Sequence, residues 1–152
     1  MLEIKENQEL NVANLLSYKG KIKQAELENI GKEMESYIHS TGAKPVDHPI
    51  TATYTVEGDV IDIELLIPID KSIDSTDKFI FKRQIKIVNA IVAEYKGNPI
   101  GLQDACNLLN QYIMEHRLQP ITVGYNVTKK ADILSPQNTE IDIYVGISPN
   151  IV

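Results

Sequence analysis

The sequence predicts an α+β fold made of a β-α-β-β unit that occurs twice. The first observation is an eight-residue stretch, Pro-Ile-Thr-Ala-Thr-Tyr-Thr-Val at 49–56. It returns at 120–127 as Pro-Ile-Thr-Val-Gly-Tyr-Asn-Val, with five of the eight positions identical. The second is a pair of strand-like segments downstream of these copies, Ile-Asp-Ile-Glu-Leu-Leu-Ile at 61–67 and Ile-Asp-Ile-Tyr-Val-Gly-Ile at 141–147. Because both repeated segments occur in the same order in each half of the sequence, we interpret the chain as a duplicated unit.

A third repeated motif, Tyr-Lys-Gly, lies upstream of each copy of the eight-residue stretch, at 18–20 and at 95–97. We therefore expect one domain of two repeats, about 1–69 and 79–152, joined by a short polar linker over 70–78. The chain of 152 residues has the usual length of a single domain. Because the linker is short, we expect both halves to share one antiparallel-rich curved sheet.

In the first repeat we expect a strand over 2–17, a helix over 23–41 and a hairpin of two strands over 50–56 and 60–67. The apolar residues of the helical segment recur at helical spacing and form one stripe. They are Leu27, Ile30, Met34, Tyr37 and Ile38. In the hairpin the period of the apolar residues becomes two, which is typical of strands with one buried face.

The second repeat follows the same order. We expect an extended segment over 79–94, a helix from Asn98 to about residue 118, and strands over 121–127 and 140–147, with a longer loop over 129–138 between them. Asn98 followed by proline is a favourable helix entry. The helical stripe consists of Leu102, Ala105, Leu109, Tyr112 and Ile113.

Alternation gives each hairpin strand an apolar face and a polar face. We expect the helices to cover the apolar face, which would hold Ile50, Ala52, Tyr54, Val56, Ile61, Ile63, Leu65 and Ile67 in the first repeat and Ile121, Val123, Tyr125, Val127, Ile141, Ile143, Val145 and Ile147 in the second. The polar face would hold Thr51, Thr53, Thr55, Asp62, Glu64, Thr122, Asn126, Glu140, Asp142 and Tyr144. Because sheets twist, we expect the polar face to form a concave groove where the halves meet.

Composition and charge exclude several classes of protein. The net charge of −6 argues against binding of nucleic acid phosphates. No apolar run approaches the roughly 20 residues that span a bilayer, and the first residues lack the features of a signal peptide. The single Cys106 cannot form an internal disulfide. These features predict a cytoplasmic protein that binds neither membrane nor nucleic acid.

No motif predicts a metal, a cofactor or a catalytic group. The three histidines, His39, His48 and His116, lie on separate elements without metal-ligand spacing. Gly20 and Gly97 stand alone, so they do not form a phosphate-binding loop. We therefore expect no metal site, no cofactor and no catalytic residues.

The order of strand, Tyr-Lys-Gly, amphipathic helix and hairpin, with Ile-Asp-Ile-Glu-Leu-Leu-Ile-Pro at 61–68, resembles the GyrI-like or SOUL-related effector-binding domain family. That family forms the ligand sensor of bacterial multidrug-responsive and AraC-type regulators, and it also occurs as stand-alone proteins. The resemblance implies a groove that binds small, often cationic and aromatic molecules, with a glutamate as counter-charge. Glu64 and Glu140 both match that glutamate, and the sequence does not decide between them. A more distant resemblance is to uncharacterised Gram-positive proteins associated with type VII secretion loci.

The chain departs from this family pattern in two ways. The double unit uses all 152 residues, so we expect no DNA-binding helix-turn-helix and no regulator activity in the chain alone. The groove is also poor in aromatic residues, since the chain has no Trp and only two Phe, both near the linker. Drug-binding members of the family line their groove with aromatic rings.

Three functions remain open. The first is a stand-alone, non-catalytic module that binds a small, cationic molecule. The second is a protein-interaction module of a secretion-associated type that uses the polar sheet face. The third is a hydrolase that uses Glu64 or Glu140.

Glu64 is either a buried counter-charge or an exposed carboxylate on a solvated face. The candidate ligand-binding residues are Glu64, Glu140, Tyr144, Asp62, Asp142, Thr53, Asn126, Tyr18 and Tyr95. The oligomeric state and the identity of the ligand stay open.

Overall fold

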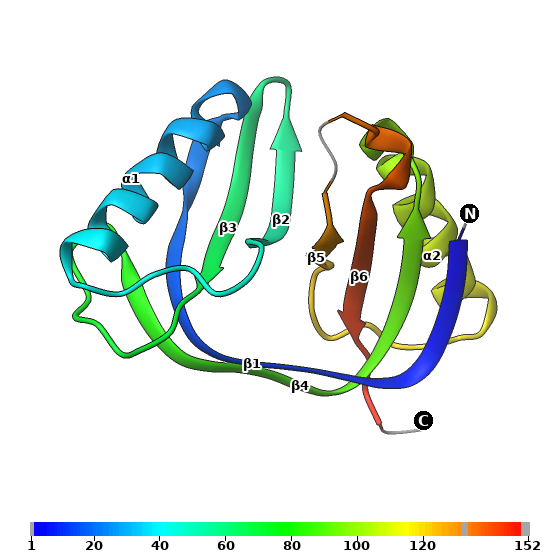
Figure 1. The fold of residues 1–152 in the computed structure, drawn as a ribbon. Helices are drawn as coiled ribbons and strands as arrows, with labels where there is room; N and C mark the ends of the chain where they lie inside the picture. Colours follow the sequence, from blue (N-terminus) through cyan, green and yellow to red (C-terminus); the bar gives the residue numbers. More distant parts are fainter. Residues whose placement is uncertain (1, 132–133, 150–152) are drawn as a thin grey trace. The chain divides into compact units, whose positions relative to one another are not determined.

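A computed structural model describes residues 2–131 and 134–149 (Figure 1). The described part contains six strands and two α-helices in the order β-α-β-β-β-α-β-β, which confirms the predicted α+β class. The elements are β1 (Leu2–Lys23), α1 (Leu27–Ser40), β2 (Ile50–Glu57), β3 (Val60–Pro68), β4 (Ile80–Lys96), α2 (Leu102–Glu115), β5 (Tyr125–Lys130) and β6 (Glu140–Gly146). None of the helices in these ranges is long and apolar enough to cross a membrane.

The chain divides into two compact units. The central unit is residues 11–86, and the terminal unit combines residues 1–10 with residues 87–152. The long strands β1 and β4 each contribute one part to each unit. The single domain of two repeats and the groove between them stay predictions.

β1 is longer than predicted. It runs through Tyr-Lys-Gly to Lys23, because its antiparallel ladder with β3 continues as far as the pair Lys23 and Val60. β5, in contrast, begins at Tyr125 rather than at residue 121. The hydroxyl group of Thr122 accepts the Gly146 N–H at 2.8 Å, so a side chain takes the place of a backbone acceptor at this end of the ladder.

In the central unit, α1 covers one face of the antiparallel β1–β3–β2 sheet, as predicted. The buried side of α1 is formed by Ile30, Met34 and Ile38. These side chains pack in one cluster with alternate residues of β1 and β3, namely Leu16, Ile22, Ile61, Ile63, Leu65 and Ile67. The predicted helical stripe and the apolar face of 60–67 are confirmed.

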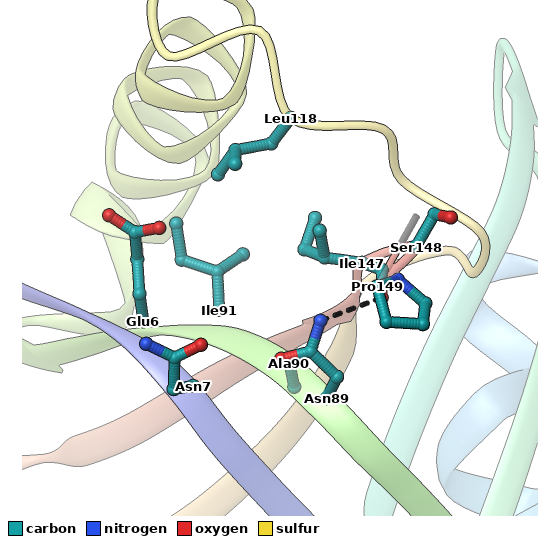
Figure 2. A pocket seen from close by; sticks show the side chains of 9 residues that line it. All are labelled: Glu6, Asn7, Asn89, Ala90, Ile91, Leu118, Ile147, Ser148 and Pro149. Atoms are coloured by element: carbon teal, nitrogen blue, oxygen red, sulfur yellow. Dashed lines mark hydrogen bonds between the residues drawn. The ribbon is translucent and has the colours of Figure 1, made fainter. Parts of the chain in front are cut away.

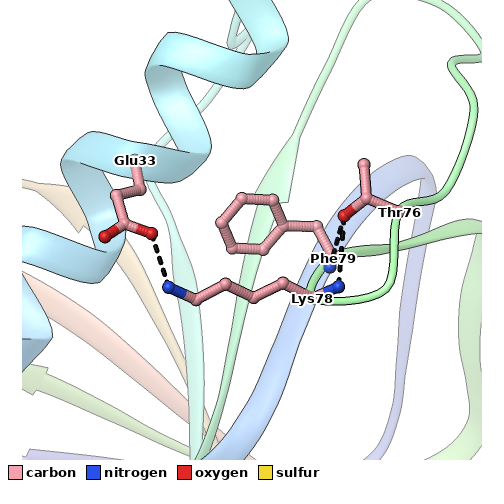
Figure 3. Close-up of polar contacts among 4 residues, drawn as sticks. All are labelled: Glu33, Thr76, Lys78 and Phe79. Atoms are coloured by element: carbon pink, nitrogen blue, oxygen red, sulfur yellow. Dashed lines mark hydrogen bonds and ion pairs between the residues drawn. The ribbon is translucent and has the colours of Figure 1, made fainter.

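The connection between β3 and β4 packs against α1 rather than serving only as a linker (Figure 3). Phe79 is buried, and its ring centroid lies 6.1 Å from that of Tyr37 on α1. The hydroxyl group of Thr76 accepts the backbone N–H groups of Lys78 and Phe79. The Lys78 ammonium lies 2.6 Å from the Glu33 carboxylate on α1. This segment therefore belongs structurally to the central unit.

The predicted faces of β2 are wrong over most of the strand, because β2 contains a β-bulge. The ladder with β3 skips Tyr54, between residues 53 and 55. Before the bulge, Ala52 lies opposite Glu64, whereas Thr53 lies opposite Ile63 on the helix-covered face. A bulge inserts one residue into a pattern of period two, so the alternation of side chains on one side of the bulge is reversed relative to the other side. In β2 the residues that precede Tyr54 therefore lie on the faces opposite to those predicted.

The same error occurs in the terminal unit. There α2 buries Ala105, Leu109 and Ile113 in one cluster with Ile91, Ala93, Ile141, Ile143, Val145 and Ile147. β5 has its own register shift between residues 128 and 130. As a result Tyr125 lies opposite Tyr144, away from the helix, and Asn126 lies opposite Ile143, on the helix-covered face.

Candidate functional site

The structure separates the nine predicted ligand-binding residues into two sets. Cross-strand partners share a face of the sheet, so the ladders assign each residue to the helix-covered face or to the face opposite. We call the opposite face open because no helix of its own unit covers it, although several of its side chains, such as Ala52, Glu64 and Leu66, are buried. The open face holds Asp62, Glu64, Glu140, Asp142 and Tyr144, as predicted. The helix-covered face holds Thr53, Asn126, Tyr18 and Tyr95, whose partners are core isoleucines and a core leucine. The predicted polar-face orientation of Thr53 and Asn126 is therefore wrong, whereas Tyr18 and Tyr95, for which the sequence predicted no face, lie on the helix-covered side.

The two Tyr-Lys-Gly motifs have a packing role. A Cβ atom at Gly20 would lie 2.8 Å from the Tyr18 hydroxyl oxygen, and one at Gly97 would lie 2.9 Å from the Tyr95 hydroxyl oxygen. Tyr18 and Gly20 lie on the same face of β1, and the Tyr95 side chain lies close to Gly97, which directly follows β4. The absence of a side chain at the glycine gives the phenol its space.

Glu64 of β3 is the one charged side chain that is fully buried among the described residues, with 3% of its surface exposed. Its Oε2 atom accepts a hydrogen bond from the Ser17 hydroxyl group at 2.6 Å and lies 2.5 Å from the Lys82 ammonium. The Tyr54 hydroxyl group donates to Oε1 at 3.4 Å. β1, β2, β3 and β4 each contribute one member of this group, which we call the Glu64 cluster.

The surroundings of Glu64 keep its carboxylate charged. Burial alone would raise the pKa of this carboxyl, because a low dielectric disfavours the charged form. The hydrogen bonds from Lys82 and Ser17, with the positive charges of Lys82 and Lys19, outweigh burial and hold the pKa of Glu64 below its ordinary value. The carboxylate is therefore ionised, and its charge is paired with the Lys82 ammonium.

A second cation lies beside the Glu64 cluster. The Lys19 ammonium lies 4.3 Å from the centroid of the Tyr54 ring, a cation–π distance. Lys19 is also the cross-strand partner of Glu64 on β1. The open face of the central unit thus presents a carboxylate and an aromatic ring, each in contact with an ammonium group.

The terminal unit carries an acidic depression of about 460 Å³ on the corresponding strands. It is lined by Glu3, Glu94, Tyr95, Lys96, Lys129, Glu140 and Asp142. Burial raises the pKa of the Asp142 carboxyl, Lys129 partly opposes this rise, and Glu94 and Glu140 add to it. The pKa of Tyr144 is raised by burial and then by the charges of Asp142 and Glu94. In this depression carboxylates repel one another, whereas in the Glu64 cluster lysine compensates the charge.

A second depression of about 280 Å³ lies at the other end of the terminal unit (Figure 2). Its lining is Glu6, Asn7, Asn89, Ala90, Ile91, Leu118, Ile147, Ser148 and Pro149. The Asn89 side chain donates to the Ile147 carbonyl at 3.0 Å, and Tyr112 donates to the Glu6 carboxylate at 2.7 Å. Two of its polar groups are thus engaged, with Asn89 tying β4 to Ile147 and Glu6 tying β1 to α2.

Sequence reasoning missed Ser17, Lys19 and Lys82. Ser17 and Lys19 flank Tyr18 and alternate with it, so correct alternation along 2–23 would have put both on the open face. Lys82 gives no such signal. It is 18 residues from Glu64 in the sequence, and only the folded chain brings the two together.

The lowered pKa of Glu64 predicts how stability depends on pH. A carboxyl whose pKa is lower in the folded state contributes stability above its unfolded pKa of about 4.3 and loses it as the pH falls through the folded value. Wild type should therefore unfold at higher urea concentration than Glu64→Gln at neutral pH. This advantage should shrink and vanish as the pH falls below about 4. Urea unfolding followed by circular dichroism across this pH range measures it.

Asp142→Asn is the matched comparison, because the pKa of Asp142 is shifted upward. A raised carboxyl pKa contributes stability at low pH and loses it as the pH rises. Asp142→Asn should therefore be more stable than wild type at neutral pH, and the two should converge in acid. Parallel pH profiles for Glu64→Gln and Asp142→Asn would contradict the assignment of opposite shifts.

No protein-family model matches the sequence, and no curated protein matches it either. Solved structures share its fold. The C-terminal domain of EcmrR aligns with a TM-score of 0.74 at 15% identity, covering 97% of this chain and 97% of that domain. In the structure of the EcmrR–DNA complex the match has the same TM-score, and this chain spans 57% of the length of EcmrR.

Two further structures extend the comparison. A hydrolase from Listeria innocua aligns with a TM-score of 0.58 at 10% identity, covering 97% of this chain and 91% of that one. SAV2435, solved with bound tetraphenylphosphonium, aligns with a TM-score of 0.56 at 8% identity, covering 98% of this chain and 94% of that one. These matches show that the chain shares the fold of the EcmrR C-terminal domain and of SAV2435.

Proposed function

We propose that this chain is a GyrI-like module that binds a small organic cation at the open face of its central unit. The observation that carries the proposal is the Glu64 cluster, in which a buried carboxylate is kept ionised and already holds an ammonium group at 2.5 Å. A buried carboxylate attracts a cation far more strongly than an exposed one, because water screens it less. The site thus has the counter-charge that recognition of a cation requires.

Two comparisons support this choice of ligand. SAV2435, which shares the fold, was solved with tetraphenylphosphonium, an organic cation with aromatic rings. EcmrR was solved in complex with DNA, but this chain has a net charge of −6, which opposes contact with phosphates. The proposal therefore concerns the small molecule and not nucleic acid.

Of the two glutamates that match the family pattern, we assign the counter-charge to Glu64. Glu140 is half-buried in the acidic depression, beside Lys96 and Lys129. Screening by water weakens the attraction of such a carboxylate for a ligand. Glu64 also lies next to an aromatic ring, that of Tyr54, which adds a surface for aromatic groups of the ligand.

Calorimetric titration with tetraphenylphosphonium tests the proposal. Wild type should bind, and Glu64→Gln should bind at least about tenfold more weakly, because the cation then loses its charged partner. Glu140→Gln is the matched control and should change the affinity less than about threefold. Neutral triphenylphosphine oxide should bind no variant measurably.

Two outcomes would contradict the proposal. The first is the absence of binding to wild type by a series of aromatic phosphonium and ammonium cations. The second is loss of binding in Glu140→Gln with Glu64→Gln unchanged, which would move the counter-charge to the terminal unit. In the first case a protein partner for the open face, which the sequence also allowed, becomes the leading candidate.

Hydrolysis is a second candidate, favoured by the likeness to the Listeria innocua hydrolase. Glu64 would then serve as the general base. The hydrogen bonds that lower its pKa also make it a weak base, because an effective general base has a pKa near the working pH. Turnover of a small electrophilic substrate that Glu64→Gln abolishes would favour this candidate over simple binding.

A further inference from the structure

The groups that would bind a cation in the Glu64 cluster are already in contact with two cations of the chain itself. The Lys82 ammonium forms an ion pair with the Glu64 carboxylate, and the Lys19 ammonium lies over the ring of Tyr54. The ring and the carboxylate are joined by the hydrogen bond from the Tyr54 hydroxyl group. The cluster therefore shows, with its own side chains, both contacts that an aromatic or alkyl cation would need.

Lys82 is placed so that it can leave the carboxylate without disturbing the sheet. Its side chain is 40% exposed, whereas the Glu64 side chain is 4% exposed. Lys82 is the third residue of β4, which begins at Ile80. A long flexible lysine side chain near a strand end can rotate its ammonium into water, where it is strongly hydrated. Glu64 has no such freedom, because Ser17 and Tyr54 also hold it.

We infer that Lys82 and Lys19 are internal ligands of this site, and that an external cation binds by exchange with them. The incoming cation replaces the Lys82 ammonium on Glu64, and its apolar groups replace Lys19 on the Tyr54 ring. This inference rests on the proposed function and adds to it a residue, Lys82, that sets the affinity and the specificity.

Exchange selects the class of ligand. A small, strongly hydrated ion offers Glu64 no more than the Lys82 ammonium already provides, so it has no advantage in competition. A weakly hydrated cation with aromatic or alkyl groups gains in addition from the Tyr54 ring and from burial of apolar surface. The site should therefore bind lipophilic cations and ignore alkali metal ions and free ammonium.

Replacing Lys82 by methionine tests the exchange, because methionine keeps the aliphatic stem and removes the competing charge. In titrations with tetraphenylphosphonium, Lys82→Met should bind about tenfold more tightly than wild type. Glu64→Gln combined with Lys82→Met should lose this gain. Lys78→Met is the matched control, since Lys78 also pairs with a glutamate of the central unit, Glu33, away from the cluster. It should leave the affinity unchanged.

The outcomes separate the inference from the proposed function. Binding that needs Glu64 but is unchanged or weakened in Lys82→Met overturns the exchange and leaves the proposed function standing. Absence of binding in wild type and in Lys82→Met overturns both. Binding that appears only in Lys82→Met also overturns the exchange, because no external cation then displaces the Lys82 ammonium in wild type.

Acylation of lysine amines provides a second test in wild type, which does not depend on whether Lys82→Met folds. Saturating tetraphenylphosphonium should increase the labelling of Lys82 by an N-hydroxysuccinimide ester, measured by mass spectrometry, because the released amine is free to react. Labelling of Lys78 should stay constant. Unchanged or reduced labelling of Lys82 at saturation would overturn the exchange.

Discussion

Leu109→Ala should lower the free energy of unfolding by about 2–5 kcal/mol. Leu109 lies on the buried side of α2 with 1% of its surface exposed, in one cluster with Ile91 and Ile143. Removal of its branched end leaves a cavity that the surrounding sheet cannot fill. Urea unfolding followed by circular dichroism measures the loss.

Leu108→Ala provides a control with the same chemical change one residue earlier. Leu108 is 52% exposed, so this substitution should change the free energy of unfolding by no more than about 0.5 kcal/mol. Equal losses for the two variants would mean that the buried face of α2 is assigned incorrectly.

Gly146→Ala should destabilise the terminal unit by about 1–3 kcal/mol through overpacking. A Cβ atom at this position would lie 2.8 Å from Cγ2 of Thr122 and 3.2 Å from Cγ2 of Ile87. Thr122 cannot simply turn away, because its hydroxyl group accepts the Gly146 N–H. The thermal midpoint of the variant reports the effect.

Gly124→Ala is the corresponding control in the same unit. A Cβ atom there would lie 3.5 Å from the Ile143 side chain, an ordinary van der Waals contact. This variant should match wild type or exceed it slightly, because alanine reduces the freedom of the unfolded chain. A larger loss for Gly124→Ala than for Gly146→Ala would contradict the packing described for β6.

The sequence predicted the elements well, because their signals are local. The stripe of Ile30, Met34 and Ile38 and the alternation along 60–67 are periodic patterns that burial alone imposes. The same reasoning placed Glu64 on the open face, since it alternates with buried isoleucine and leucine. Its burial could not be predicted, because it depends on side chains from three other strands.

The sequence did not predict register. The bulge at Tyr54 reverses the faces of the preceding residues, and nothing in Thr-Tyr-Thr marks it. The two Tyr-Lys-Gly motifs also suggested equivalent positions that the ladders do not show. Tyr18 lies opposite Leu65, whereas Tyr95 lies opposite Ile141, which corresponds in the repeat to Ile61 and not to Leu65. Strand pairing is set by tertiary contacts and turns, so identical short motifs in two repeats need not have equivalent cross-strand partners.

Nuclear magnetic resonance with tetraphenylphosphonium tests most directly the claim that Glu64 of the central unit is the counter-charge for a cation. The claim predicts that titration shifts the resonances of Lys19, Tyr54, Glu64 and Lys82, and that these shifts disappear in Glu64→Gln. Shifts confined to the acidic depression around Asp142, and unaffected by Glu64→Gln, would contradict it.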